Sequence, residues 1–180
     1  MQIVKYNKKT FFLLIDRWQK TLGMNNPTPW GARNGHRVVS IGRYAYIIGG
    51  SLGSTLQRNW LKYDIVGAPL YEGMPYAEKY SAPWIPRERH SVVKWKSGIL
   101  MSGGYAGGLT GYLNDVWYLN ALTDEWELKT NSAPWKPRFQ HSMVVHRRKI
   151  YLCGGNNQKD VWSSLDGGNK YMNNMTASKR

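Results

Sequence analysis

One motif occurs three times along the chain with the same internal spacing. It consists of a Pro-Trp pair, an Arg three residues after the Trp, a His three residues after the Arg, and a Gly pair that begins thirteen residues after the His. The copies begin at Pro29, Pro83 and Pro134, and only the stretch after the Gly pair varies in length. Such a period indicates an architecture in which each repeat is one structural unit that packs against its neighbours.

Each copy contains short apolar runs that predict four β-strands. The first strand follows the His, and the second ends at the Gly pair, as at residues 46–48, 99–101 and 150–152. Continuous apolar runs of this length are typical of strands that are buried on both faces. The third strand is expected at residues 59–64, 114–119 and 160–164, and the fourth is clearest at residues 125–128. Together with the nineteen glycines along the chain, these runs predict an all-β fold.

Several separated elements of the repeat together resemble the kelch motif. They are the opening that contains Pro, Arg and His, the Gly pair after an apolar strand, and an Asp-Val-Trp sequence at residues 115–117 and 160–162. A further pattern, Ser164-x-Asp166-x-Gly168-x-x-Tyr171, resembles the Asp-box turn of some propellers, with Tyr where Trp is usual. The resemblance implies a kelch-type β-propeller, in which each repeat forms one four-stranded antiparallel blade and the blades pack around a central channel.

This resemblance treats residues 1–180 as a single propeller segment. It implies a half blade at residues 1–22, followed by blades at residues 29–80, 83–130 and 134–176. The apolar run from Phe11 to Ile15 is expected to be a buried strand of the half blade, because it is too short for the core of a signal peptide. About three and a half blades result, whereas closed propellers have roughly four to eight. We therefore expect an incomplete or open propeller: a piece of a longer one, an open arc, or one that another chain completes.

The Arg of each repeat is a candidate for partner binding. The resemblance places the loops before the first strands on the face that usually meets partners, and the candidates there are Arg33, Arg87, Arg89 and Arg138. Guanidinium groups are suited to carboxylates and phosphates. Alternatively, each repeat Arg braces its own blade by donating to loop carbonyls. The repeat histidines, His36, His90 and His141, are spread around an axis and are expected to serve local backbone groups rather than a metal ion.

The net charge of +14 favours an acidic partner. Cations occupy the turns between the first and second strands and are candidates for anion binding: Arg43, Lys94, Lys96, Arg147, Arg148 and Lys149. No acidic residue lies within these turns, which are expected on the face opposite the repeat arginines. A solvated basic surface is the alternative explanation.

The favoured function is a non-catalytic interaction or scaffold module that binds a protein partner within a larger assembly, without a catalytic residue, cofactor or metal. One alternative is a peripheral subunit of an RNA-containing particle that contacts phosphates through the basic turns. Another is a fragment of a carbohydrate-active or copper-oxidase propeller, although no matching set of ligands or catalytic acids is visible. Glu88, between two arginines, is more simply a salt-bridged loop residue. No cleavable signal peptide or membrane span is evident, which favours an intracellular location without identifying the compartment.

Overall fold

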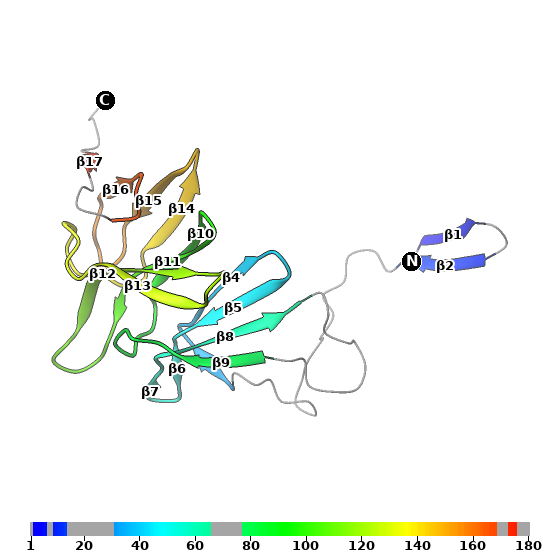
Figure 1. Ribbon diagram of the computed structural model, residues 1–180, viewed down its shortest axis with the longest axis horizontal. Helices are drawn as coiled ribbons and strands as arrows, with labels where there is room; N and C mark the ends of the chain where they lie inside the picture. Colours follow the sequence, from blue (N-terminus) through cyan, green and yellow to red (C-terminus); the bar gives the residue numbers. More distant parts are fainter. Residues whose placement is uncertain (1, 7–8, 14–30, 66–76, 169–172, 176–180) are drawn as a thin grey trace.

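The computed structural model describes the backbone of residues 2–6, 9–13, 31–65, 77–168 and 173–175, and the side chains of residues 31–65 and 80–168 (Figure 1). Every regular element in these residues is a β-strand. No helix in this part of the chain could therefore cross a membrane.

Three four-stranded antiparallel sheets form the body of the molecule (Figure 1). Blade one contains β4 (Arg37–Ile41), β5 (Tyr44–Ile48), β8 (Asn59–Asp64) and β9 (Ala77–Ser81). Blade two contains β10 (Ser91–Trp95), β11 (Gly98–Tyr105), β12 (Tyr112–Asn120) and β13 (Glu125–Thr130). Blade three contains β14 (Ser142–His146), β15 (Lys149–Cys153), β16 (Val161–Ser164) and β17 (Asn173–Met175). In each sheet the strands lie in chain order, which confirms the all-β, bladed fold; β9 is a strand that the apolar pattern did not reveal.

Two small sheets accompany the blades. The strands β3 (Arg33–Asn34), β6 (Ser51–Leu52) and β7 (Thr55–Leu56) form one of them, beside blade one. Near the N-terminus, β1 (Gln2–Tyr6) pairs with β2 (Lys9–Leu13). The expected strand of the half blade overlaps β2 up to Leu13, but residues 14–22 lie outside the described residues. The half blade therefore stays a prediction.

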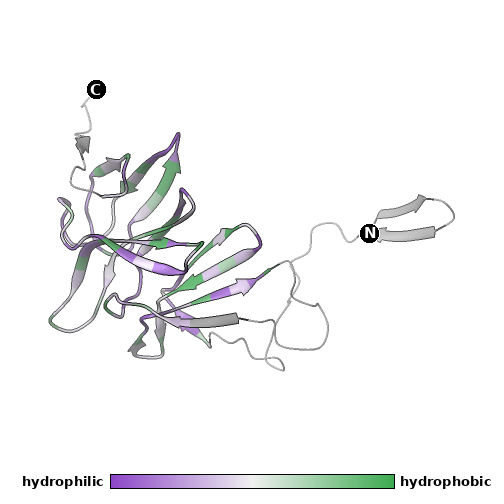
Figure 2. Ribbon diagram, in the orientation of Figure 1, coloured by the Kyte–Doolittle hydropathy of each residue, from purple (hydrophilic) through white to green (hydrophobic). Residues whose placement is uncertain are grey.

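The blades pack face to face because their second strands are apolar on both sides. Ile99 and Met101 of β11 are fully buried in the core shared with blade one, whereas Leu100 is buried in the core shared with blade three. Complete burial contributes about 1.5–3 kcal/mol for each such side chain. Trp84 and Trp135, from the Pro-Trp pairs that precede blades two and three, fill the same two cores. Figure 2 shows hydrophobic and hydrophilic residues mixed along the strands, with hydrophilic residues at the tips of the hairpins that join first to second strands.

The Gly pair of each blade is in close backbone contact with the next blade. Gly50 N donates to Arg87 O at 2.8 Å, and Gly104 N donates to Arg138 O at 2.9 Å. A Cβ at Gly49 would lie only 2.8 Å from the ring of His90 in the next blade. A side chain would thus push the following blade away, which explains the requirement for glycine.

The strand order also fixes two opposite ends of the blades. The turns that join first to second strands lie along one side of the molecule in Figure 1, and the β6–β7 hairpin and the β11–β12 loop lie on the other. We call the first side the turn face. The second, which also carries the segments that precede the first strands, is the loop face.

Candidate binding surfaces

The repeat arginines are internal braces. Arg87 is fully buried, and its guanidinium binds Asp115 with two contacts of 2.6 and 2.7 Å and donates to Gly103 O at 3.0 Å. Arg138 is equally buried and makes the corresponding contacts of 2.6 and 2.7 Å with Asp160. Two parallel charge-assisted bonds are the strongest pairing that a guanidinium forms with a carboxylate.

Arg33 follows the same plan in blade one. Its Nη1 donates to Gly49 O at 2.9 Å and to Asn59 Oδ1 at 3.0 Å, and only 9% of the residue is exposed. The expectation that Arg33, Arg87 and Arg138 form a partner-binding arc is therefore corrected. Their donors point into the blades, and the alternative explanation, bracing, describes what the structure shows.

The Asp-Val-Trp motif completes each brace. Trp117 Nε1 donates to Asp115 Oδ2 at 2.8 Å, and Trp162 Nε1 donates to Asp160 Oδ2 at 2.7 Å. The hydrogen bond from Arg138 is the largest influence that lowers the pKa of Asp160 to about 2. Trp162 is buried and Trp117 partly buried, so the two tryptophans hold equivalent positions.

The repeat histidines lie where blades meet. His141 Nε2 lies 2.8 Å from the hydroxyl of Ser102 in blade two, so this His contacts a side chain of the preceding blade. His90 is completely buried, and this burial, together with the charge of Arg87, lowers its pKa well below the ordinary value. Among the described residues, no three His, Cys, Asp or Glu side chains gather as metal ligands would.

Arg89 differs from the three repeat arginines because it is exposed. Its side chain is 46% exposed, forms an ion pair with Glu88 at 3.3 Å, and lies 6.0 Å from the centre of the Phe139 ring. Phe139 stacks on Tyr112 at 4.8 Å, and Tyr105 lies 5.8 Å from Tyr112. We call Arg89, Tyr105, Tyr112 and Phe139 the aromatic patch.

The three aromatic members of this patch were not predicted from the sequence. Tyr105 and Tyr112 lie on either side of the Gly-rich loop between β11 and β12, which the kelch resemblance assigns to the loop face. That position was the available signal. Phe139 directly follows the repeat Arg138, but its contact with a tyrosine of the preceding blade depends on how the blades pack.

The turn face brings together three of the six predicted anion-binding residues. Lys94, Lys96 and Arg148 line a cavity of about 450 Å³ between blades two and three, which we call the cationic pocket. The other described residues that line it are apolar: Trp95, Val145 and Leu165.

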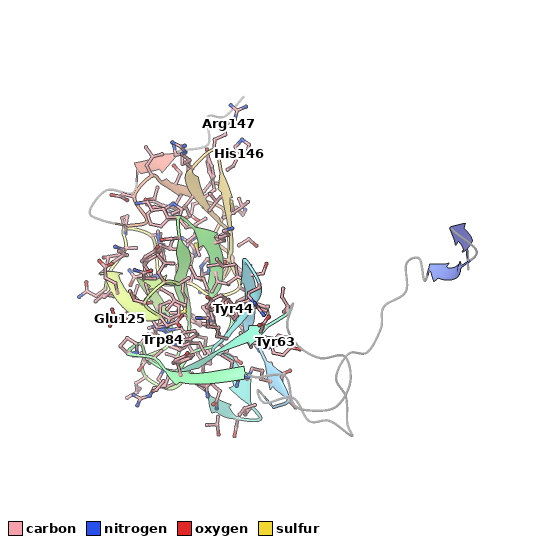
Figure 3. All side chains as sticks on the ribbon, turned by 45° about the vertical axis from the view of Figure 1, so that its right-hand side comes forward. Tyr44, Tyr63, Trp84, Glu125, His146 and Arg147 are labelled. Atoms are coloured by element: carbon pink, nitrogen blue, oxygen red, sulfur yellow. The ribbon has the colours of Figure 1, made fainter. Side chains whose placement is uncertain are left out.

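The other three predicted cations do not line this pocket. Arg43 forms an ion pair with Asp64 of β8, so a carboxylate outside the turn neutralises its charge. Lys149 Nζ lies 5.8 Å from the Tyr151 ring centre. Arg147 is exposed, and Figure 3 shows it with His146 at the tip of the β14–β15 hairpin.

Three of the turn cations, Lys96, Arg147 and Arg148, have a positive φ. The first residue of the three equivalent two-residue turns has a positive φ: 58° at Gly42, 53° at Lys96 and 47° at Arg147. Blade one has glycine there, as such turns favour. A residue with a side chain costs about 1–2 kcal/mol in this left-handed region. In blades two and three, Lys96 and Arg147 adopt this unfavourable conformation in the two turns that flank the cationic pocket.

Comparisons with known proteins agree with the repeat and the fold. The family model described as the Kelch motif matches residues 86–132. Kelch domain-containing protein 10 of Rattus norvegicus is 27% identical over 129 residues, which cover 67% of this chain and 29% of that protein, and the Homo sapiens protein matches equally over 27% of its length. The tRNA wybutosine-synthesizing protein 2/3/4 of Oryza sativa subsp. japonica is 25% identical over 132 residues, or 73% of this chain and 12% of that protein.

This chain thus spans less than a third of the length of the curated relatives that it matches. The matched segment at residues 86–132 contains all four strands of blade two together with its Arg, His, Gly pair and Asp-Val-Trp sequence. The matched motif and the described blades together show a kelch-repeat β-propeller segment in this chain.

Proposed function

We propose that this chain is a non-catalytic protein-binding module that uses the aromatic patch on its loop face and acts within a larger assembly. Kelch repeats generally mediate protein–protein interaction, and that general role supports the proposal. The single observation that carries it is the exposed cluster of Arg89 with Tyr112 and Phe139 on a face whose repeat arginines are buried.

The residue types of the patch are those that dominate protein interfaces. Tyr and Arg are enriched among the few residues that carry most of the binding energy, because they offer a large contact area with few rotatable bonds or a forked donor. Tyr112 is 43% exposed, and Leu109, at the tip of the adjacent β11–β12 loop, is fully exposed. The patch therefore presents an aromatic surface, a cation and an apolar side chain within one short stretch of blade two and the segment before blade three.

The acid closest to this patch has a structural use. Glu88 accepts a hydrogen bond from the Ser51 hydroxyl at 2.8 Å and pairs with Arg89. Its backbone also exchanges two hydrogen bonds with Tyr105, of 3.0 and 2.9 Å. These contacts hold the loops of blades one and two together, and they support a binding role rather than an acid catalyst.

Affinity capture from the cells in which the protein occurs, with quantitative mass spectrometry, tests the proposal. Tyr112→Ala and Arg89→Ala should each deplete the same partner, because truncating a central interface residue costs 2 kcal/mol or more, roughly a 30-fold loss. Leu109→Ser is a third patch variant. Its matched control is Leu122→Ser, since Leu122 is also highly exposed but lies in the β12–β13 turn on the turn face. An unchanged set of captured proteins in all three patch variants would contradict the proposal.

A further inference from the structure

The cationic pocket is a built feature of the interface between two blades. Its walls come from three separate turns: Lys94 to Lys96 at the end of β10, Val145 and Arg148 around the β14–β15 turn, and Leu165 after β16. Because the buried core between blades two and three fixes these turns relative to one another, the pocket keeps its shape without a ligand.

The apolar wall is held in place by its surroundings. Trp95 is 4% exposed, with Tyr118 edge-on at 5.8 Å and Lys96 Nζ 4.1 Å from its ring centre. Leu165 is 69% exposed, and hydrogen bonds fix the turn that follows it. The Ser164 hydroxyl donates to Asp166 Oδ1 at 2.7 Å, and Asp166 Oδ1 accepts from Gly168 N at 3.0 Å. The Asp-box-like turn thus presents a leucine side chain to the pocket.

The cations of the pocket are not neutralised by acids of the fold. Within the part of the chain that the structure describes, no ion pair involves Lys94, Lys96 or Arg148. Lys96 and Arg148 also adopt positive φ angles of 53° and 63°, which are unfavourable for residues with a side chain. These cations without an ion pair therefore combine an unfavourable backbone conformation with a position beside an apolar cavity. Such a combination is typical of a binding site.

From this arrangement we infer a second binding site, on the turn face, for an acidic peptide segment that carries an apolar anchor side chain. The anchor enters the space between Val145 and Leu165, and carboxylates on either side of it pair with Lys94, Lys96 and Arg148. Charge complementarity selects an acidic segment, and the apolar wall adds binding energy that charge alone does not supply. The site is independent of the aromatic patch, since the two lie at opposite ends of the blades.

The same geometry argues against single-stranded nucleic acid as the ligand. Proteins bind such strands by stacking bases on exposed aromatic rings along a basic groove. Among the described residues, Trp95 is the one aromatic residue that lines the pocket, and its ring is enclosed by Lys96 and Tyr118. A backbone close to the other parts of the ring completes the enclosure, because a Cβ at Gly167 would lie 2.9 Å from Trp95 Cζ3. An aliphatic anchor suits the remaining surface better than a base.

Fluorescence anisotropy with the full chain tests this site. The probe is a short capped peptide in which glutamates flank a central leucine; one comparison peptide has glycine in place of the leucine, and a single-stranded RNA of equal charge is the other. The leucine peptide should bind more tightly than the glycine peptide, by roughly tenfold or more, which is the effect of burying one leucine side chain. Leu165→Ser should remove that preference without altering the charge of the protein.

Charge variants complete the test. Lys96→Ser with Arg148→Ser should weaken binding of the leucine peptide severalfold more than Lys136→Ser with Lys159→Ser, a double variant that removes two exposed cations away from the pocket. Equal losses in both double variants would show nonspecific attraction and overturn the proposal. So would equal binding of the leucine and glycine peptides, the absence of peptide binding, or tighter binding of the RNA that depends on Lys96 and Arg148. Because Tyr112→Ala should leave this binding unchanged, failure here is distinct from failure of the loop-face function.

Discussion

At the scale of single residues, the recurring polar side chains are part of the core. A buried guanidinium is expensive unless its donors are satisfied. Arg87 meets this requirement with Asp115, whose second oxygen also accepts from Trp117. An isolated Arg in a loop-face segment gives no sign of whether it points inward or outward. Its downstream Asp-Val-Trp sequence does, because the carboxylate that neutralises it arrives from the third strand of the same blade.

The buried histidines make the stability of the fold depend on pH. Burial, followed by the charges of Arg138 and Arg37, lowers the pKa of His141 to about 3 from 6.5. Between these two values the unfolded chain binds the proton and the folded chain does not. Stability is therefore complete above about pH 6.5 and falls as the pH decreases toward 3, by at most about 1.4 kcal/mol per pH unit for this residue. His90, whose pKa is also well below the ordinary value, acts in the same direction.

Urea unfolding at about pH 7 and about pH 5 measures this effect, and the midpoint should be lower at the more acidic pH. His141→Gln keeps a polar group near Ser102 but cannot take up a proton, so its midpoint should change less. Asp160 does not interfere, because the stability that it contributes is lost only as the pH falls from its ordinary pKa of 3.8 toward its folded pKa of about 2. A midpoint that is the same at both pH values in the unaltered chain would contradict the prediction.

At the scale of elements, the turn cations should reduce stability. Lys96→Gly places glycine at a φ of 53°, and Arg147→Gly places it at a φ of 47°. Because glycine adopts positive φ without a steric penalty, each change should raise the free energy of unfolding by about 1 kcal/mol. Gly42→Lys is the matched reverse change in blade one, where a Cβ would meet no atom within 4 Å and only the φ of 58° opposes it. It should lower stability by a similar amount. Chemical denaturation of the three variants measures these differences, and destabilised glycine variants would show that these side chains support the fold.

The elements could be predicted from the sequence wherever a pattern is local. The apolar runs that end at the Gly pairs mark β5, β11 and β15 because those strands are buried on both faces. The strand β9 has no such run. The cationic pocket and the aromatic patch could be predicted only in part. The repeat indicates the cations of the pocket and the loop that carries two tyrosines of the patch. Leu165 and Phe139 join these sites through contacts between blades, which the sequence does not show.

At the scale of the whole molecule, blade three has a face that no other described blade covers. Its side turned from blade two carries Val144, Val161 and Cys153, all exposed, at register positions that the packing between blades buries elsewhere. Gly154 gives the same indication. A Cβ at Gly103 would lie 2.7 Å from Arg138 O of the next blade, whereas a Cβ at Gly154 would meet nothing closer than Gln158 O at 3.6 Å. Within the described residues, blade three is ready to receive another blade and has none.

We predict that the isolated chain associates through this face, because an apolar blade face needs a neighbour or a cap. Sedimentation velocity should show species heavier than the 20.7 kDa chain. Val144→Lys with Val161→Lys should shift the distribution to single chains, since both residues lie on the uncovered face and make it charged. Leu122→Lys adds a cation at an exposed leucine of the turn face and should leave the association unchanged. A compact particle with the mass of one chain would contradict this prediction, since it would show that the exposed face of blade three needs no neighbour.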